Sequence, residues 1–316
     1  MNSRLLKLSL ASTIAVVAGT QILGCHATQS DEHASYKLIY SSLESTKRSI
    51  YLSDEHGVRR LKVIDATDSD GYPAVSPDGK LVAFYGKYDK FKTWSIHSVA
   101  IDGSNLKRLT HTKNKWDSAP AWSLDGRTIL FTREYKNPNG KWQSQIWLMN
   151  ADGSEQRKIS GLQGGGASFI DNDRVLFHSH TSPSQISIAN IDGSNMVKLT
   201  NDATDNRAPR LSPDGNHIVY LSNRDGNQEV YIMDINGKNQ KRLTFNQVED
   251  WDATWSADGN QIFFASENSQ GSFDIYKAKR DGSSLQKVLN RGSQVAAVKT
   301  LNAAALQKLI QSNPPN

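Results

Sequence analysis

The sequence holds one cysteine, Cys25, among its 316 residues, so no disulfide bond can form within the chain. It has no Gly-x-Ser-x-Gly motif and no glycine-rich loop of the kind that cradles phosphate. These absences remove two common catalytic signatures. We expect no cofactor and assign no catalytic residue, which favours a non-enzymatic role without deciding it.

No stretch of the chain is dominated by charge of one sign. Lys and Arg number 37 and Asp and Glu number 32, for a formal net charge of +5. The cations are scattered, as at Arg108, Lys158, Lys198 and Arg242. This distribution is typical of solvated outer strands, so we expect no nucleic-acid partner.

A long apolar run occurs near the N-terminus. It covers residues 8–23 and follows Arg4 and Lys7. This pattern predicts a signal peptide over residues 1–24, because the run is too short and too interrupted by Ser and Thr for a membrane span. The polar residues after Cys25 predict a flexible tether over 25–35.

The end of this run, Ile22-Leu23-Gly24-Cys25, resembles the lipobox of bacterial lipoproteins. In that family the cysteine becomes the first mature residue and carries lipid, including palmitate. His26 stands where an inner-membrane retention signal has Asp, so the resemblance implies anchoring to the periplasmic side of the outer membrane. The alternative is an ordinary cleaved signal with an incidental cysteine.

Most of the remaining chain consists of copies of a turn followed by a strand. Ser212-Pro213-Asp214-Gly215 fits a type I turn, and the apolar residues 218–221 predict a strand buried on both faces. Copies begin at Ser76, Ser123 and Ser256, with a degenerate one at Ile170. Their spacing of about 42 to 47 residues indicates a propeller or a solenoid.

A second turn, Asp-Gly or Asn-Gly, lies between two further strands of each unit. Its copies begin at Asp102, Asp152, Asp192, Asn236 and Asp281. Each unit therefore has four short strands, which is the composition of a propeller blade.

These repeats resemble those of TolB-like six-bladed β-propellers. The resemblance covers residues 36–299 and implies one all-β domain with six four-stranded blades. The first blade lacks an opening strand, and residues 294–298 have no partner after them, so we expect this segment to complete the first blade and close the ring. Residues 300–316 predict a short C-terminal helix, with Asn302 at its N-cap.

Acids and large aromatic residues recur just before the first strand of each unit, which in a propeller lies near one mouth of the central channel. Such residues suit a protein or carbohydrate partner. The candidate binding residues are Asp70, Tyr72, Trp116, Asp117, Asn206, Arg207, Asp250, Trp251 and Asp252. The alternative is structural, with the acids capping turns and the indoles packing between blades. Trp122 and Trp255, inside the repeat motif, are expected in the core.

Two further features fall in the degenerate unit. His178 and His180 form an i, i+2 pair on one face of a strand end, and such a pair can bind a metal ion. No third ligand is near in sequence, and simple exposure is the alternative. Gly164-Gly165-Gly166 is expected to be a flexible connection that leaves one sector of the channel mouth without side chains.

The resemblance implies two functions. The first is a lipid-anchored, monomeric periplasmic propeller that binds a protein, as the TolB propeller binds the peptidoglycan-associated lipoprotein at its channel mouth. This chain departs from TolB because it carries its own lipobox and no α/β domain precedes its propeller. The second is a propeller that acts on or binds a polysaccharide or oligosaccharide, since some propeller lyases use metal-binding histidines.

Overall fold

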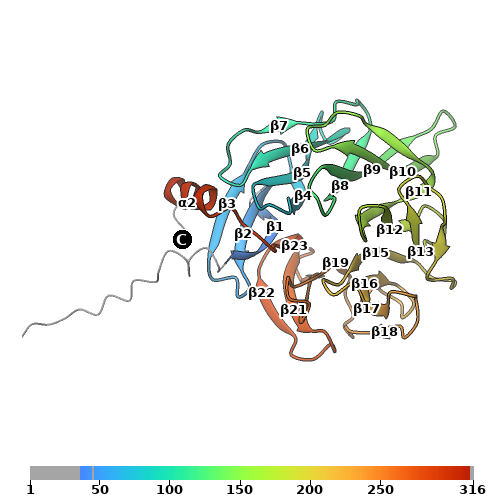
Figure 1. The fold of residues 1–316 in the computed structure, drawn as a ribbon. Helices are drawn as coiled ribbons and strands as arrows, with labels where there is room; N and C mark the ends of the chain where they lie inside the picture. Colours follow the sequence, from blue (N-terminus) through green and yellow to red (C-terminus); the bar gives the residue numbers. More distant parts are fainter. Residues whose placement is uncertain (1–35, 45, 314–316) are drawn as a thin grey trace, which may run out of the picture.

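The structure is a computed structural model that describes residues 36–44 and 46–313. The predicted signal peptide, Cys25 and the tether lie outside the described residues. Figure 1 shows twisted β-sheets set side by side around a common centre, with the helix α2 on the outside. No helix within the described residues is long and apolar enough to cross a membrane.

Three of the sheets have four strands each. The first has the order β23 (Gly292–Ala297), β1 (Tyr36–Glu44), β2 (Lys47–Asp54), β3 (Arg60–Ile64). The second has β15 (Asn206–Leu211), β16 (His217–Ser222), β17 (Glu229–Asp234), β18 (Lys241–Arg242). The third has β19 (Asp250–Trp255), β20 (Gln261–Glu267), β21 (Phe273–Lys279), β22 (Gln286–Leu289).

A fourth, 11-stranded sheet holds the rest of the ring. Its strands are β4 (Asp70–Val75), β5 (Leu81–Tyr88), β6 (Thr93–Ala100), β7 (Lys107–Arg108), β8 (Trp116–Trp122), β9 (Thr128–Lys136), β10 (Trp142–Asn150), β11 (Arg157–Phe169), β12 (Arg174–Ser179), β13 (Ile186–Asn190) and β14 (Val197–Lys198). Two links join its repeat units. A parallel bridge between Trp94 and Trp116 connects β6 to β8, and β11 pairs with β10 through its first half and with β12 through its second.

The turns form as the sequence predicts. The Gly215 N–H donates to the Ser212 carbonyl at 2.9 Å, and Gly215 has a φ of +73°. The Asp214 carboxylate accepts a bond from the Asn216 N–H at 3.0 Å. Ile218 and Tyr220 in the following strand have no exposed surface. Local turn chemistry therefore fixes where each strand begins.

The ring closes through the last strand of the chain. β23 pairs with β1, with Ala297 opposite Leu38 and Ala296 opposite Ile39. The Ser42 hydroxyl also donates to the Arg291 carbonyl at 2.9 Å. The expected pairing of the C-terminal segment with the first unit is therefore present.

The helix α2 (Ala303–Ser312) packs against the sheet that holds both ends of the ring. The Asn302 side chain caps it by accepting a bond from the Ala305 N–H at 3.0 Å. Leu306 and Leu309 are fully buried in a cluster with residues of β1, β2 and β3. The expected C-terminal helix is therefore present, and its apolar side belongs to the core.

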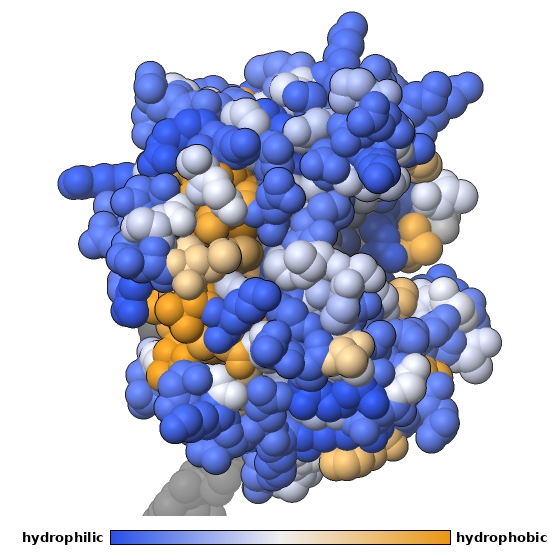
Figure 2. Space-filling view, turned by 90° about the vertical axis from the view of Figure 1, so that its right-hand side faces the viewer, coloured by the Kyte–Doolittle hydropathy of each residue, from blue (hydrophilic) through white to orange (hydrophobic). Residues whose placement is uncertain are grey.

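The side of the molecule that carries β10, β11 and β13 is mostly hydrophilic (Figure 2). Apolar residues gather in a strip along its left edge in that view, and its outline is recessed on the right. The core lies between the sheets, where large side chains such as Phe84, Phe131 and Phe264 are nearly or fully buried.

Candidate functional site

A cavity of about 910 Å³ occupies the centre of the ring. Its walls come from β4, β8, β11, β15, β19 and β23, which we call the inner strands. A second hollow, of about 650 Å³, lies between β17 and β21 and is lined by polar side chains such as Arg280 and Asp234. Arg280 already pairs with Asp214 at 3.3 Å. The central cavity is the one that contains residues predicted from the sequence.

Each inner strand has a residue with left-handed backbone geometry near its middle. These residues are Tyr72 (φ 47°), Ala119 (49°), Gly166 (59°), Ala208 (48°), Asp252 (56°) and Gln294 (55°). The strand register shifts beside each of them, as in a β-bulge. All six residues line the cavity, and we call this ring of residues the bulge ring.

The bulge ring is filled on one half and open on the other. Tyr72, Asp252 and Gln294 lie on three neighbouring inner strands and are linked. The Gln294 N–H donates to Asp252 Oδ2 at 2.9 Å, and the Tyr72 N–H donates to Gln294 Oε1 at 3.1 Å. The other half has the small residues Ala119, Gly166 and Ala208. The open space of the channel therefore lies in front of β8, β11 and β15.

Charges in the filled half are held in a poorly solvated setting. Burial raises the pKa of Asp252, against the lowering effect of its hydrogen bonds and of nearby Arg210. The Asp252 charge and burial together raise the pKa of Tyr72 well above its usual value. The Arg210 guanidinium donates to the Gly166 carbonyl at 2.8 Å and so reaches across to β11. These contacts connect neighbouring inner strands and stabilise the channel wall around Asp252.

Four predicted site residues start inner strands but lie beneath the surface. Asp70, Asp117, Asn206 and Asp250 have no exposed area. Asp70 accepts bonds from the Thr67 hydroxyl and the Ala66 N–H, both at 2.6 Å, and burial raises its pKa.

Asp117 is paired in the same buried layer. Its carboxylate accepts two bonds from the Arg133 guanidinium, at 2.6 and 2.8 Å, and both side chains are almost completely buried. Asp250 accepts two bonds from the Asn246 amide, at 3.0 and 3.1 Å. Burial raises the pKa of Asp250 to about 6.

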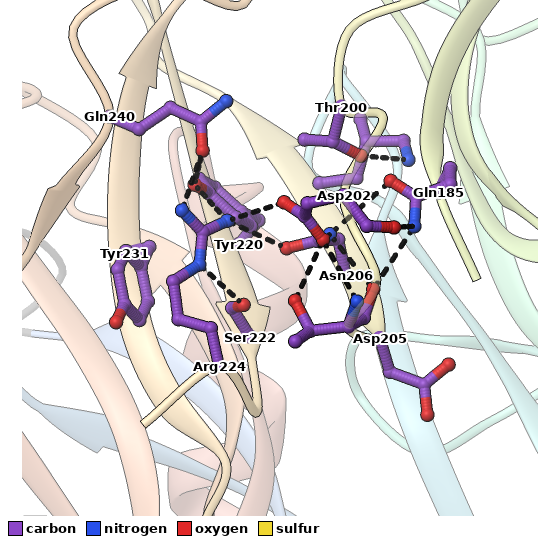
Figure 3. A network of polar contacts seen from close by, with 12 residues as sticks. Gln185, Thr200, Asp202, Asp205, Asn206, Tyr220, Ser222, Arg224, Tyr231 and Gln240 are labelled. Carbon is purple, nitrogen blue, oxygen red and sulfur yellow. Dashed lines mark hydrogen bonds and ion pairs between the residues drawn. The ribbon is translucent and has the colours of Figure 1, made fainter. Parts of the chain in front are cut away.

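Asn206 lies at the centre of a polar network (Figure 3). Its amide donates to Asp202 Oδ1 at 2.8 Å, and its carbonyl oxygen accepts a bond from Arg224 at 3.0 Å. The Gln185 amide donates to the Asp202 carbonyl at 3.0 Å. All four residues bond within the buried layer: Asp70 accepts a backbone N–H of the connection before its strand, and the other three bond to neighbouring side chains. They do not line the cavity, so the prediction that they lie at the mouth is corrected.

Four other predicted residues do line the cavity: Tyr72, Arg207, Trp251 and Asp252. Arg207 pairs with Asp205 at 3.2 Å, while its buried Nε has no hydrogen-bond partner within the described part of the chain. Trp251 is half-buried and packs against a core cluster. The expected core positions Trp122 and Trp255 are buried, and each indole N–H donates to a backbone carbonyl at 3.0 Å.

Trp116 belongs to a row of stacked rings at the β6–β8 junction. Its ring centroid lies 4.8 Å from that of Trp94 and 4.5 Å from that of Trp142. Trp94 also stacks on Tyr85 at 4.9 Å. We call these four residues the aromatic row. The row starts in the channel, where Tyr85 and Trp94 line the cavity, and ends at the exposed Trp142.

The two histidines have separate protein partners. Burial lowers the pKa of His178 to about 3, so its imidazole is neutral near pH 7, and Nδ1 accepts a bond from the Ala208 N–H at 3.4 Å. His180 Nε2 lies 3.0 Å from the Trp142 carbonyl. Within residues 36–44 and 46–313, no group of three or more His, Cys, Asp and Glu side chains could hold a metal ion.

The expected flexible connection at Gly164–Gly166 is instead part of β11. A Cβ on Gly164 would lie 2.0 Å from the His178 carbonyl oxygen, so glycine permits the close pairing of β11 with β12. Gly165 and Gly166 line the cavity. The channel wall at these glycines has no side chains, as expected. The segment is a tightly packed strand, however, and not a flexible connection.

Several channel residues were absent from the sequence prediction. Arg48, Lys87, Trp94 and Glu134 line the cavity although they come from β2, β5, β6 and β9. Outer strands of a unit reach the channel at its mouth, and no local pattern marks which of their residues do so. Part of the bulge ring is marked in the sequence, because Pro73, Pro120 and Pro209 each follow a residue with left-handed backbone geometry.

Comparison with known proteins places these features in a family. A family model for the TolB beta propeller domain matches residues 27–207. A model for the Tricorn protease N-terminal beta propeller domain matches residues 170–313.

Two curated relatives match part of the chain. An uncharacterized protein of Agrobacterium fabrum is 30% identical over 162 residues, which is 46% of this chain and 52% of that protein. A TolB homologue of Chlorobium luteolum is 27% identical over 158 residues, or 48% of this chain and 34% of that protein. The chain thus aligns with about half or less of the length of these relatives.

Solved structures extend the comparison to most of the chain. TolB from Acinetobacter baumannii superposes with a TM-score of 0.72 at 21% identity, over 83% of this chain and 66% of that one. An oligogalacturonate lyase in complex with manganese has a TM-score of 0.55 at 15% identity, over 82% and 75%. At these identities the likeness concerns the fold alone. Since the TolB family model covers more than half of the chain, the protein belongs to the TolB β-propeller family.

Proposed function

We propose that this protein is a non-enzymatic, lipid-anchored periplasmic propeller that binds an envelope protein at the mouth of its central channel. The observation that carries the proposal is the asymmetry of the bulge ring. Three linked polar side chains fill one half, and three small residues leave the other half open. A cavity of about 910 Å³ is large enough to hold a ligand or a short peptide segment.

We propose that the ring has six blades. Each of the six inner strands begins one unit, and β23 supplies the inner strand of the unit that contains β1. The parallel bridge at Trp94 and the long strand β11 connect three of these units into one sheet. Closure through β23 leaves no inner strand unpaired, which favours a stable monomer.

The walls of the channel suit a polypeptide. Trp251 and Trp94 offer aromatic surface, Arg207 and Lys87 offer positive charge, and Ala208 leaves room in the open half. Protein interfaces concentrate binding energy in such aromatic and arginine residues. These side chains are already placed by packing and by ion pairs such as Arg207–Asp205, so less ordering is needed on binding.

The proposed location rests on the sequence of the N-terminal segment. A lipid on Cys25 and the predicted tether over residues 25–35 would hold the propeller near a membrane surface. Replacing Cys25 with Ser should release the protein from the membrane fraction and remove lipid labelling. Unchanged membrane association of the unlabelled variant would contradict the anchor.

A carbohydrate-active propeller remains the alternative. It would rely on His178 and His180, whose ring nitrogens Nδ1 and Nε2 respectively face the Ala208 N–H and the Trp142 carbonyl. The side chains that line the channel give more support to protein binding, because they combine cations with aromatic surface.

A substitution that fills the open half tests the proposal. Tyr72 shows that the bulge geometry accepts a tyrosine, and Ala119 has nearly the same φ, 49° against 47°. Ala119→Tyr should therefore fold and obstruct the channel. Val197→Tyr, on the exposed outer strand β14, is the matched control.

The assay is cross-linking of the full chain in its native envelope, followed by purification and identification of cross-linked proteins. We expect a defined envelope protein with the wild type and with Val197→Tyr, and its loss with Ala119→Tyr and Trp251→Ala. Equal recovery with all four proteins, or retention of an oligosaccharide in place of a protein, would overturn the proposed function.

A further inference from the structure

Positive charge is in excess along the central channel. Five cationic side chains line it: Arg48, Lys87, Arg207, Arg210 and Lys299. Two carboxylates line it, those of Glu134 and Asp252. An excess of one charge in a cleft with poorly solvated walls attracts ligands of the opposite charge.

The excess is concentrated at Lys87 and Arg48. Within the described residues the Lys87 ammonium has no hydrogen bond or ion pair, and it lies over rings, 4.2 Å from the Trp94 centroid and 5.5 Å from that of Tyr85. Arg48 donates to the hydroxyls of Ser293, at 2.6 Å, and Ser41, at 3.5 Å, and to no carboxylate of the residues that the structure describes. Burial, and then the Arg48 charge, lower the pKa of Lys87, as expected when two cations share a half-buried place.

The carboxylates of the channel have other partners. Asp252 is held by the Gln294 N–H at 2.9 Å, and burial raises its pKa. Burial raises the pKa of Glu134, and its carboxyl bonds to the Ser144 side chain and lies near Arg207. Asp252 lies near enough to Arg48 to feel its charge, but within the described residues no carboxylate pairs with Lys87. The complement for Lys87 is therefore a group from outside the described residues.

We propose that Lys87 and Arg48 bind a carboxylate of an acidic peptide segment, with an apolar part of that segment against Trp94. This inference rests on the proposed protein-binding function and specifies its partner. A side-chain carboxylate accepts charge-assisted hydrogen bonds from both cations. Trp94 provides the apolar contact, and the open half beside Ala119 gives the peptide backbone room to continue.

An extended peptide fits these features better than a compact anion. Inorganic phosphate would use the cations alone and would gain nothing from Trp94 or from the open half. An acidic peptide uses the charge, the indole and the space together. Oligogalacturonate, which carries carboxylates on a sugar backbone, is the competing source of the same group.

The test is a selection from displayed random octapeptides on the purified full chain in detergent. Lys87→Met serves for counter-selection, because methionine keeps most of the unbranched apolar side chain and removes the ammonium group. We expect the recovered peptides to be enriched in Asp or Glu beside an apolar residue. Recovery of peptides without acidic enrichment would overturn the acidic partner and leave the protein-binding function standing.

Affinities then separate the site from general charge effects. A selected peptide should bind Lys87→Met about 10-fold or more weakly, as should its Asn or Gln analogue with the wild type. Lys136→Met is the matched control, since Lys136 also lies over an indole, 5.5 Å from the Trp142 centroid, but outside the channel. It should change the affinity less than 2-fold.

Three results would overturn the inference. The first is equal loss of affinity in Lys136→Met and Lys87→Met. The second is equal binding of the acidic peptide and its amide analogue. The third is binding of oligogalacturonate or inorganic phosphate as tightly as the peptide, with the same dependence on Lys87, which would assign the site to anions in general.

Discussion

Replacing Asp117 with Asn should destabilise the ring far more than the same change at a surface ion pair. Asp117 accepts two bonds from Arg133, at 2.6 and 2.8 Å, and the exposed fractions of the two side chains are 0% and 3%. The substitution keeps the shape but leaves the Arg133 guanidinium charged and buried without its counter-ion. Breaking a buried pair in this way costs about 3 to 5 kcal/mol.

The matched control is Asp171→Asn. Asp171 pairs with Arg174 at 2.8 Å, but their side chains are 42% and 52% exposed. Water solvates either partner when the other is lost, so the cost should be below about 1 kcal/mol. Both pairs join an aspartate to an arginine, and they differ in burial and in the two backbone N–H groups that Asp171 Oδ1 also accepts.

Thermal unfolding measures the contrast. In a domain of this size 1 kcal/mol shifts the melting temperature by roughly 2 to 4 °C, so Asp117→Asn should lower it by roughly 10 °C and Asp171→Asn by less than about 4 °C. The double variant Asp117→Asn with Arg133→Met should recover part of the loss, because no buried charge then remains. Equal shifts in the two single variants would refute the assignment of Asp117 to a buried structural pair.

Three further outcomes are expected. The pKa of Asp250 is raised in the folded protein to about 6, above its usual value of 3.8, so the contribution of Asp250 to stability should fall by up to roughly 3 kcal/mol as the pH rises from about 4 to 6. His178, whose pKa is lowered to about 3, contributes a slope of the opposite sign over this range. The test is therefore the difference in stability between wild type and Asp250→Asn in urea titrations, which should shift in favour of the variant from pH 4 to pH 6, and a constant difference would contradict it. Truncation after Asn290 removes β23 and should abolish cooperative unfolding in calorimetry. Truncation after Thr300 should keep a folded ring but lower its melting temperature, because α2 buries two leucines. If both truncated proteins melted at the temperature of the parent, the closure through β23 would be contradicted. Gly164→Ala places a methyl group 2.0 Å from the His178 carbonyl oxygen and should lower the melting temperature by several degrees, and an unchanged value would show that β11 can move away from β12.

The repeats of the sequence predicted the fold because their information is local. Ser-Pro-Asp-Gly and Asp-Gly turns need particular residues at particular φ values, as Gly215 shows at +73°. Strand lengths and the order of pairing follow once these turns are placed. The pairing of β23 with β1 was also predictable, because an unpaired strand at each end of a ring has one obvious partner.

The site was predicted only in part. Asp70 and Asp252 look alike in the sequence, yet Asp70 caps a buried turn and Asp252 faces the channel. The bulge in each inner strand determines which side chains are buried and which face the channel, because it changes their direction within two or three residues of the strand start. Lys87 and Arg48 come from outer strands and meet in space only when neighbouring units pack together, which no pattern within one repeat encodes.

The closure of the ring has a mechanical consequence. β1 is the first described strand after the predicted tether, and it lies between β23 and β2. A pulling force that reaches Tyr36 along the strand therefore loads two ladders of hydrogen bonds in shear, and the bonds of each ladder must yield together. An edge strand at the same position would peel away one bond at a time. The strand order thus makes the N-terminal end of the described propeller more resistant to tension than an edge strand at that position would be.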